Sequence, residues 1–148
     1  MTIAQKCRNP LNIRFNPANR WQGSRGSYKG FVVFNSTKFG YRAALILLRN
    51  YIRNGYNTPR KIISRWAPPS ENNTDSYVKT VCDAIGCQED SPIVGTVGMC
   101  MLCRAMAVVE SGATSVTDLY LYDLCNEYRI FVELNKVNYG KREKVNLG

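Results

Sequence analysis

The chain has 148 residues, of which 45% are hydrophobic, enough for one domain that buries about two thirds of its unfolded surface. It contains no histidine, which excludes nucleophilic triads and metal sites built on histidine within the chain. No apolar run reaches the roughly 18 to 20 residues that span a bilayer, and the first residues lack the apolar core of a classical signal peptide, so we expect no membrane span. The net charge of +9 favours a polyanionic partner or a solvated basic face. The scattered basic residues match no DNA-reading motif, so no specific nucleic-acid partner is predicted.

Residues 1–30 are rich in turn-forming residues and predict irregular structure. Asn-Pro pairs begin at Asn9 and Asn16, and glycines follow at positions 23, 26 and 30. The apolar, bulky run Phe31–Phe34 has the character of a short strand. We therefore expect a small hairpin or an irregular β lobe here.

The middle of the chain predicts three helices, over about residues 37–54, 58–66 and 73–85. Polar residues suited to N-terminal capping precede each of them, and a proline occupies the first position of the second. Apolar residues recur at helical spacing in all three. Gly55 and Gly86 follow the first and third helices, whereas a Pro-Pro pair breaks the second.

The apolar residues 97–109 predict a fourth helix that is buried on nearly every face and stops at Gly112. A fifth helix is expected to start near Ser115 or Thr117 and to turn five side chains inward: Leu121, Leu124, Cys125, Tyr128 and Phe131. Residues 135–148 are predicted to form a loosely ordered basic tail. The whole pattern, residues 1–148, is that of a mainly α (α+β) single domain with a buried central helix, which is the outline of a lysozyme-like fold.

Six cysteines leave more than one interpretation open. Cys100 and Cys103 lie inside the fourth helix, where free cysteines usually act as small buried hydrophobes. Cys82 and Cys87 have four residues between them, a spacing that does not suit a zinc site, so we predict no metal and no cofactor. The even number of cysteines also allows one or two disulfides in an oxidising compartment.

Glu110 is the strongest candidate for chemistry. It comes at the last turn of the apolar fourth helix. Apolar surroundings raise the pKa of a carboxyl group, and the negative end of the helix dipole acts in the same direction. A carboxylic acid that stays protonated near neutral pH can protonate a leaving sugar oxygen, as in glycosidases. The alternative is a surface glutamate just after a buried helix.

The segment Arg8-Asn-Pro-Leu-Asn-Ile-Arg14, followed by Trp21-Gln-Gly, resembles the "NPGNIR … W-x-G" opening of a phage-associated family. Members are often labelled virion structural proteins and look like peptidoglycan hydrolases. The resemblance covers roughly residues 8–112 and includes the specific block Trp66-Ala-Pro-Pro-Ser-Glu-Asn-Asn-Thr74. The chain departs from the family at Leu11, where Gly is usual, and at Val109, where His is frequent.

A second similarity concerns the Glu-Ser pair at positions 110–111. It looks like the catalytic helix end of soluble lytic transglycosylases and flagellar-type glucosaminidases. In the latter, a segment similar to residues 9–23 follows that helix, whereas here it precedes it. This order suggests a circularly permuted lysozyme-type domain, in which Glu110 and residues 12–23 face each other across a cleft.

This resemblance implies that Glu110 is the general acid and Glu71 a candidate second carboxylate. Glu71 has an alternative role, with its asparagine neighbours, in capping the third helix; in that case one acid serves throughout, as in lytic transglycosylases. The remaining candidates would bind substrate: Ser111, Asn12, Arg14, Trp21 and Tyr77. Their alternatives are core packing for the two aromatic residues, a turn for Asn12 and a solvated charge for Arg14.

Three function classes follow. The first is an enzyme that cleaves peptidoglycan glycan strands, of lytic transglycosylase or muramidase/glucosaminidase type. The second is a non-catalytic virion structural or wall-binding protein on the same fold, and the third is a nucleic-acid binder suggested by charge alone. The expected location is a phage virion or the bacterial cell envelope (periplasm), with a virion or secretion-machine partner.

Overall fold

The computed structural model describes residues 1–134, and the predicted basic tail, residues 135–148, lies outside the described residues. The described part is mainly helical with one small antiparallel sheet. Its elements in chain order are α1 (Ile3–Lys6), β1 (Ser24–Tyr28), β2 (Phe31–Phe34), α2 (Thr37–Arg53), α3 (Pro59–Trp66), α4 (Thr74–Ile85), α5 (Gly95–Ser111) and α6 (Asp118–Tyr128). The predicted mainly α, α+β fold class is confirmed.

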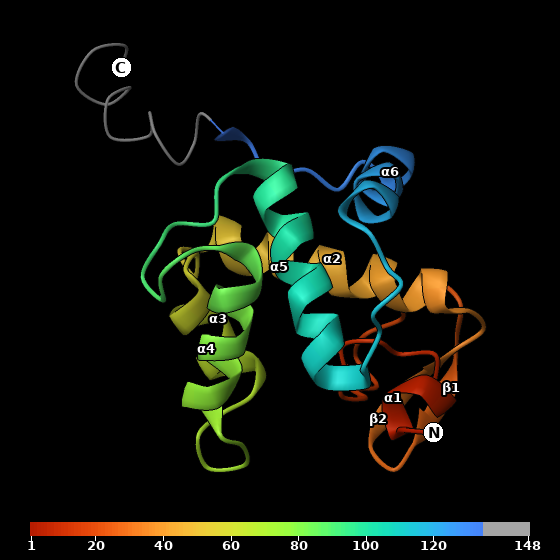
Figure 1. Ribbon diagram of the computed structural model, residues 1–148. Helices are drawn as coiled ribbons and strands as arrows, with labels where there is room; N and C mark the ends of the chain where they lie inside the picture. Colours follow the sequence, from red (N-terminus) through yellow and green to blue (C-terminus); the bar gives the residue numbers. More distant parts are fainter. Residues whose placement is uncertain (135–148) are drawn as a thin grey trace.

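Helix α5 runs through the middle of the molecule and α2 crosses behind it (Figure 1). Helices α3 and α4 lie on one side of α5, and α6 lies on the other. The hairpin and α1 sit near the C-terminal end of α5. Buried side chains from the hairpin and from helices α2 to α6 form one hydrophobic cluster, so the end of α5 is held between the helices and the β lobe. None of the helices in residues 1–134 is long and apolar enough to cross a membrane.

Local signals in the sequence place most helix ends. The side chains of Thr58, Asn73 and Thr117 each accept a hydrogen bond from a backbone amide in the first turn of α3, α4 and α6. Gly86 and Gly112 end α4 and α5 in the left-handed conformation, which glycine adopts without steric cost. These predicted starts and stops are confirmed. Helix α1 begins with a capping box in which Thr2 and Gln5 exchange hydrogen bonds, but this helix and strand β1 lie in the part predicted to be irregular.

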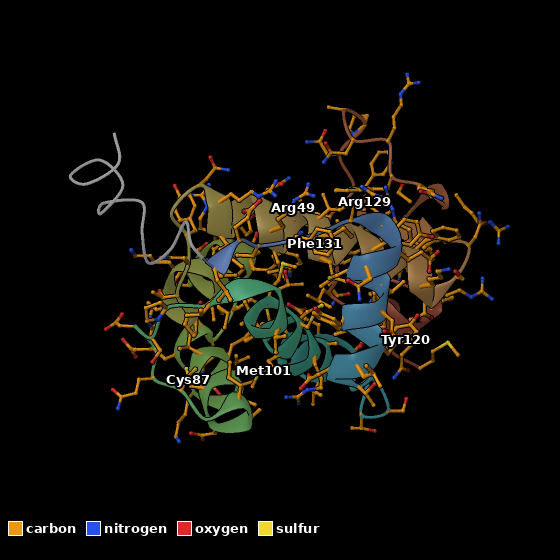
Figure 2. The ribbon with its side chains drawn as sticks, turned by 90° about the horizontal axis from the view of Figure 1, so that it is seen from above. Arg49, Cys87, Met101, Tyr120, Arg129 and Phe131 are labelled. Atoms are coloured by element: carbon orange, nitrogen blue, oxygen red, sulfur yellow. The ribbon has the colours of Figure 1, made fainter. Side chains whose placement is uncertain are left out.

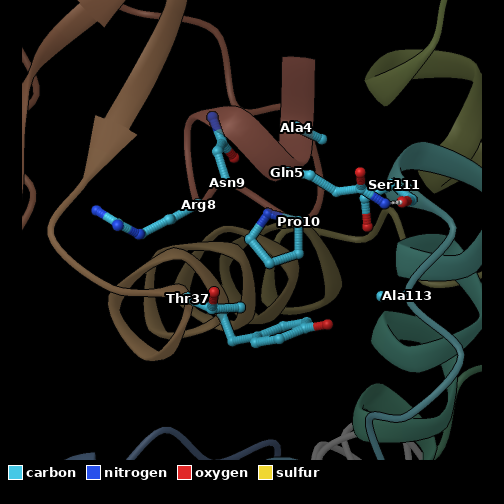
Figure 3. Close-up of a pocket in the computed structure, with 9 residues that line it drawn as sticks. Ala4, Gln5, Arg8, Asn9, Pro10, Thr37, Ser111 and Ala113 are labelled. Atoms are coloured by element: carbon cyan, nitrogen blue, oxygen red, sulfur yellow. Dashed lines mark hydrogen bonds between the residues drawn. The ribbon is translucent and has the colours of Figure 1, made fainter. Parts of the chain in front are cut away.

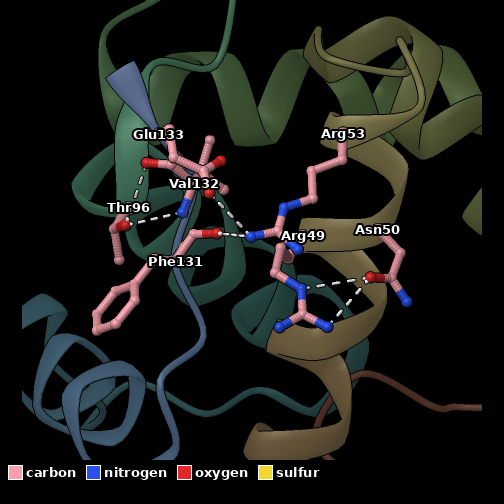
Figure 4. Close-up of polar contacts among 7 residues, drawn as sticks. All are labelled: Arg49, Asn50, Arg53, Thr96, Phe131, Val132 and Glu133. Carbon is pink, nitrogen blue, oxygen red and sulfur yellow. Dashed lines mark hydrogen bonds and ion pairs between the residues drawn. The ribbon is translucent and has the colours of Figure 1, made fainter. Parts of the chain in front are cut away.

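The prediction that Phe131 turns inward as part of the last helix is wrong. Helix α6 ends at Tyr128 because Arg129 adopts a left-handed conformation, so helical spacing no longer applies. Phe131 is 38% exposed, and its carbonyl accepts a hydrogen bond from Arg53 (Figure 4). Val132 is tied to Thr96 by hydrogen bonds in both directions, which hold this segment against the start of α5.

Burial of α5 is also less complete than the apolar run predicts. Most of its middle is buried, but Met101 and Arg104 are half-buried, and Val97, Val108 and Val109 near its two ends are exposed. Helix α6 covers one side of α5 (Figure 2). Tyr120 lies near the start of α6, and Arg129 lies just past the end of α6. Cys100 and Cys103 are buried, as predicted, and all six cysteines are free thiols.

Gly40, in the first turn of α2, allows the backbone of residues 8–10 to pack directly on the helix. A Cβ atom at Gly40 would lie 2.5 Å from the Arg8 carbonyl oxygen and 2.6 Å from Pro10 Cδ. Because the first of these is a backbone atom, the loop that carries Asn12 must shift. We expect Gly40→Ala to destabilise the fold by about 1–3 kcal/mol in urea unfolding.

Gly98 provides the matched control for Gly40. It lies within α5, and an added Cβ would meet its nearest neighbour at 3.5 Å, an ordinary contact. Gly98→Ala is therefore expected to be neutral or to stabilise by about 0.5–1 kcal/mol. A Gly40→Ala protein as stable as Gly98→Ala would show that the packing around Gly40 is looser than described.

Candidate active site

Glu110 is half-buried on the last turn of α5, with both carboxylate oxygens engaged. Tyr77, near the start of α4, donates its hydroxyl hydrogen to Glu110 Oε2 at 2.9 Å. Asn12, in the segment before β1, donates from Nδ2 to Glu110 Oε1 at 2.8 Å and to the Glu110 backbone carbonyl at 3.1 Å. Two segments distant in sequence therefore hold the carboxyl group that α5 carries.

The conformation of Asn12 suits this position. Its φ is +53°, in the left-handed region that asparagine tolerates better than most residues. A carbonyl oxygen can only accept, so the amide nitrogen of Asn12 must face Glu110 for the bond to the backbone to form. This fixes the amide orientation and presents N–H groups, which favour the ionised carboxylate.

Opposing effects act on the pKa of Glu110, and burial is the largest of them. Removal from water raises the pKa above its ordinary value, whereas the donors Asn12 and Tyr77 and the positive charge of Arg14 lower it. The net direction is upward, so Glu110 keeps its proton to a higher pH than an exposed glutamate. Tyr77 is itself buried, and burial together with the Glu110 charge raises its pKa, so it stays a neutral donor.

A groove with a volume of about 510 Å³ lies beside this carboxyl group. Asn12, Arg14 and Glu71 line one part of it. Tyr51, Arg65, Trp66 and Pro68 are among the residues that line the rest. Glu110 is not a lining residue; Asn12, which both lines the groove and bonds Glu110, connects the two.

Arg14 and Glu71 form an ion pair at the groove, with Arg14 Nη2 3.1 Å from Glu71 Oε2. Their side chains are 64% and 51% exposed, so the pair is well hydrated and adds little to stability. The cap of α4 is supplied by Asn73, and Glu71 makes no part of it. Glu71 thus lies on the groove wall with a cationic partner, 57 residues away in sequence.

Two predicted site residues lie elsewhere. Ser111 lines a separate pocket of about 220 Å³ near α1 and the start of α2 (Figure 3). There Ser111 Oγ donates to the Ala107 carbonyl at 2.8 Å, and the Ser111 carbonyl accepts from Gln5 Nε2 at 2.7 Å. Trp21 is half-buried against the hydrophobic cluster and does not line the groove. The structure therefore gathers Glu110, Tyr77, Asn12, Arg14 and Glu71, and leaves out Ser111 and Trp21.

Two residues that support the candidate site were not predicted from the sequence. Asn9 is fully buried and holds the loop that carries Asn12 through bonds to the backbone of Ile13 and Val32. Trp66 Nε1 donates to the Leu11 carbonyl at 2.8 Å and fixes the other side of the same loop. Leu11, which replaces the glycine usual in the resembling family, is buried and has no left-handed φ, so no glycine is required there.

The described residues thus define a mainly helical protein with a half-buried carboxyl group beside a polar groove. No family model matches the chain. The chain is similar to Protein P5 of Pseudoalteromonas phage PM2, with 29% identity over 114 residues that cover 74% of this chain and 71% of that protein. The similarity is to a bacteriophage protein, and its name specifies no activity.

Proposed function

We propose that this chain cleaves the glycan strands of peptidoglycan, with Glu110 as the general acid. The observation that carries the proposal is a half-buried carboxyl group, with a raised pKa, held by Asn12 at the edge of a groove of about 510 Å³. A general acid needs its pKa close to the working pH so that it is protonated before the step and can give up the proton during it. The resemblance to lysozyme-type helix ends supports the same role.

The direction of proton transfer follows from the two carboxylate oxygens. Glu110 Oε2 faces the buried Tyr77, whereas Oε1 is bonded to the groove-lining Asn12. We infer that the proton leaves from the Oε1 side towards the glycosidic oxygen. Once the proton has moved, Glu110 is ionised, and the hydrogen bonds from Asn12 and Tyr77 stabilise its charge. The same two donors that lower the pKa of Glu110 therefore favour the proton transfer.

The positive charge that develops on the sugar ring needs a partner, and two routes are open. Glu71 lies on the groove wall and could supply a carboxylate, as in muramidase- or glucosaminidase-type enzymes. Alternatively, the substrate's own N-acetyl group reacts and Glu110 acts first as acid and then as base, which yields an anhydro sugar. The ion pair of Glu71 with Arg14 favours the second route, because a salt-bridged carboxylate is less available to the sugar ring.

The groove carries features suited to a glycan strand with peptide stems. Arg14 and Arg65 place positive charge on its wall, where a peptide-stem carboxylate can pair with it. Tyr51 and Trp66 contribute aromatic surface to the same wall, and Asn12 contributes an amide. The similarity to a phage protein supports a virion setting, in which the protein meets the bacterial wall from the particle.

Digestion of purified peptidoglycan tests the proposal. We expect the protein to reduce the turbidity of a wall suspension and to release muropeptides that mass spectrometry can identify. An anhydro end is lighter by one water than a hydrolysed end, so the same spectra separate the two routes. Wall binding without turbidity loss would favour the alternative, a non-catalytic virion or wall-binding protein.

Tyr77→Phe tests the hydrogen bond to Glu110 Oε2. The substitution removes a donor that stabilises the carboxylate, so the pKa of Glu110 rises further. We expect the alkaline limb of the pH–rate profile for wall clearing to move to higher pH, because the acid stays protonated longer. Tyr122→Phe, at an exposed position on α6, is the control and should leave the profile unchanged. A shift of the limb to lower pH would contradict the assignment of Glu110 as the acid.

A further inference from the structure

Two buried thiols face each other where α6 packs on α5. The Sγ atoms of Cys100 in α5 and Cys125 in α6 lie 3.8 Å apart, in contact, although the residues are 25 positions apart in sequence. Both side chains are almost completely removed from solvent. The proposed function uses neither residue, and nothing in the candidate active site depends on them.

The surroundings make the two thiols unequal. Cys103, one turn along α5, is also buried, and burial raises its pKa. The pKa of Cys125 is lowered, chiefly by the hydrogen bond with Cys100, and the positive charge of Arg49 in α2 acts in the same direction. Arg49 thus favours a thiolate at Cys125, although either sulfur of the pair can be the donor.

We propose that Cys100 and Cys125 are a latent disulfide that joins α6 to α5 when the protein meets an oxidising environment. The two sulfurs must approach from 3.8 Å to the usual bond length of about 2.05 Å. They already lie in contact, on two helices that pack against each other. This inference is independent of the proposed function.

A small-molecule disulfide such as glutathione disulfide can serve as the oxidant of the two thiols. The Cys125 thiolate attacks one sulfur of glutathione disulfide, which forms a mixed disulfide and releases one glutathione thiolate. Cys100 then loses its proton and attacks Cys125 Sγ, which expels the second glutathione thiolate. The two protein thiols are oxidised, one glutathione disulfide is reduced to two glutathione thiols, and the protons pass to the released thiolates. Because Cys125 is buried, the first step requires transient local opening of α6.

Cross-linking has a measurable effect on stability. The bond would close a loop of 25 residues and restrict the unfolded chain. We expect the Tm of the oxidised protein to exceed that of the reduced protein by about 5 °C or more. The bond would also fix α6 against α5, the helix that carries Glu110.

Peptide mapping after incubation of the folded full chain with glutathione disulfide tests the inference directly. Trypsin releases Cys125 as the sole cysteine of residues 105–129, and Cys100 within residues 80–104. We expect these two peptides to be joined, with fragment ions that assign the bond to Cys100. Cys103→Ala should keep the link and the rise in Tm, whereas Cys100→Ala and Cys125→Ala should lose both.

Three outcomes would overturn the inference. Cys100 and Cys125 could both remain free and react with an alkylating reagent only after unfolding. Cys125 could instead pair with Cys103. Oxidation could also join only Cys82 to Cys87; burial and the neighbouring Cys87 thiol raise the pKa of Cys82 to about 11. The map of the wild-type protein alone distinguishes these outcomes, so the test holds even where a variant fails to fold.

Discussion

Glu110→Gln is expected to lower the rate of wall clearing by about 10²- to 10⁴-fold, the contribution typical of a general acid. The amide has nearly the same shape as the carboxyl group but has no acidic proton to give to the glycosidic oxygen. Asn12 can still donate to the remaining side-chain oxygen, so the loop at the groove should stay in place. The rate of turbidity loss, together with a pull-down on insoluble wall, separates lost chemistry from lost binding.

Glu127→Gln is the matched control for this substitution. Glu127 lies on α6, where it pairs with Lys38 at 2.9 Å, and it does not line the groove. We expect full activity from it. Glu71→Gln then distinguishes the two routes: a loss as large as that of Glu110→Gln indicates a second catalytic carboxylate, and a small loss indicates a single acid. Clearing at the wild-type rate by Glu110→Gln would remove Glu110 from the mechanism.

Glu110→Gln also tests the raised pKa of Glu110, because that pKa makes the stability of the wild-type fold depend on pH. A carboxyl group whose folded pKa is raised binds its proton more tightly in the folded state, so stability is lost as pH rises from the unfolded pKa through the folded pKa. Glutamine does not titrate and escapes this loss. The stability of Glu110→Gln relative to wild type should therefore increase with pH across that window and stay level below it. Urea unfolding at a series of pH values measures the difference.

How much the sequence could predict depends on the range of the interactions. Thr58, Asn73 and Gly112 place helix ends because capping involves residues a few positions apart. The bond from Asn12 to Glu110 spans 98 residues, and that from Tyr77 spans 33. No periodicity or spacing in a single sequence encodes such pairs. The resemblance to a permuted lysozyme-type domain indicated that Glu110 and the segment containing Asn12 would face each other, but not which side chains would meet.

Local sequence rules also fail where the backbone becomes left-handed at a residue that does not favour that conformation. Arg129 adopts a left-handed conformation usually taken by glycine, so the end of α6 and the exposure of Phe131 could not be predicted. Ser111 shows the same limit at the site. It neighbours Glu110 in sequence, but successive residues of a helix are turned by about 100°, so Ser111 faces a different pocket, where its Oγ bonds the Ala107 carbonyl.

Asn9→Ala is expected to destabilise the fold by about 3–5 kcal/mol, more than a typical single substitution. Asn9 is 0% exposed, and its amide makes three bonds: Nδ2 donates to the Ile13 carbonyl at 2.9 Å and to the Val32 carbonyl at 3.0 Å, and Oδ1 accepts from the Ile13 amide at 2.9 Å. Truncation leaves the buried Ile13 amide without this acceptor and opens a small cavity. Urea unfolding at neutral pH measures the loss.

Asn9→Asp separates the hydrogen bonds from the size of the side chain. The carboxylate can still accept from the Ile13 amide, but it would place a negative charge against two carbonyl oxygens in a site without water access. We expect a loss at least as large as that of Asn9→Ala. Asn16→Ala is the control: Asn16 is exposed, its side chain accepts only from the Ala18 amide at 2.9 Å, and its removal should cost about 1 kcal/mol or less.

Asn9→Ala should lower the activity of the site as well as the stability of the fold. Asn9 anchors residues 9–13, and Asn12 within that loop holds the carboxyl group of Glu110. When the anchor is lost, Asn12 can leave Glu110 even while the helices remain folded, so wall clearing should fall at temperatures well below the Tm of the variant. Full clearing by a destabilised but folded Asn9→Ala protein would show that the site does not depend on the anchor at Asn9.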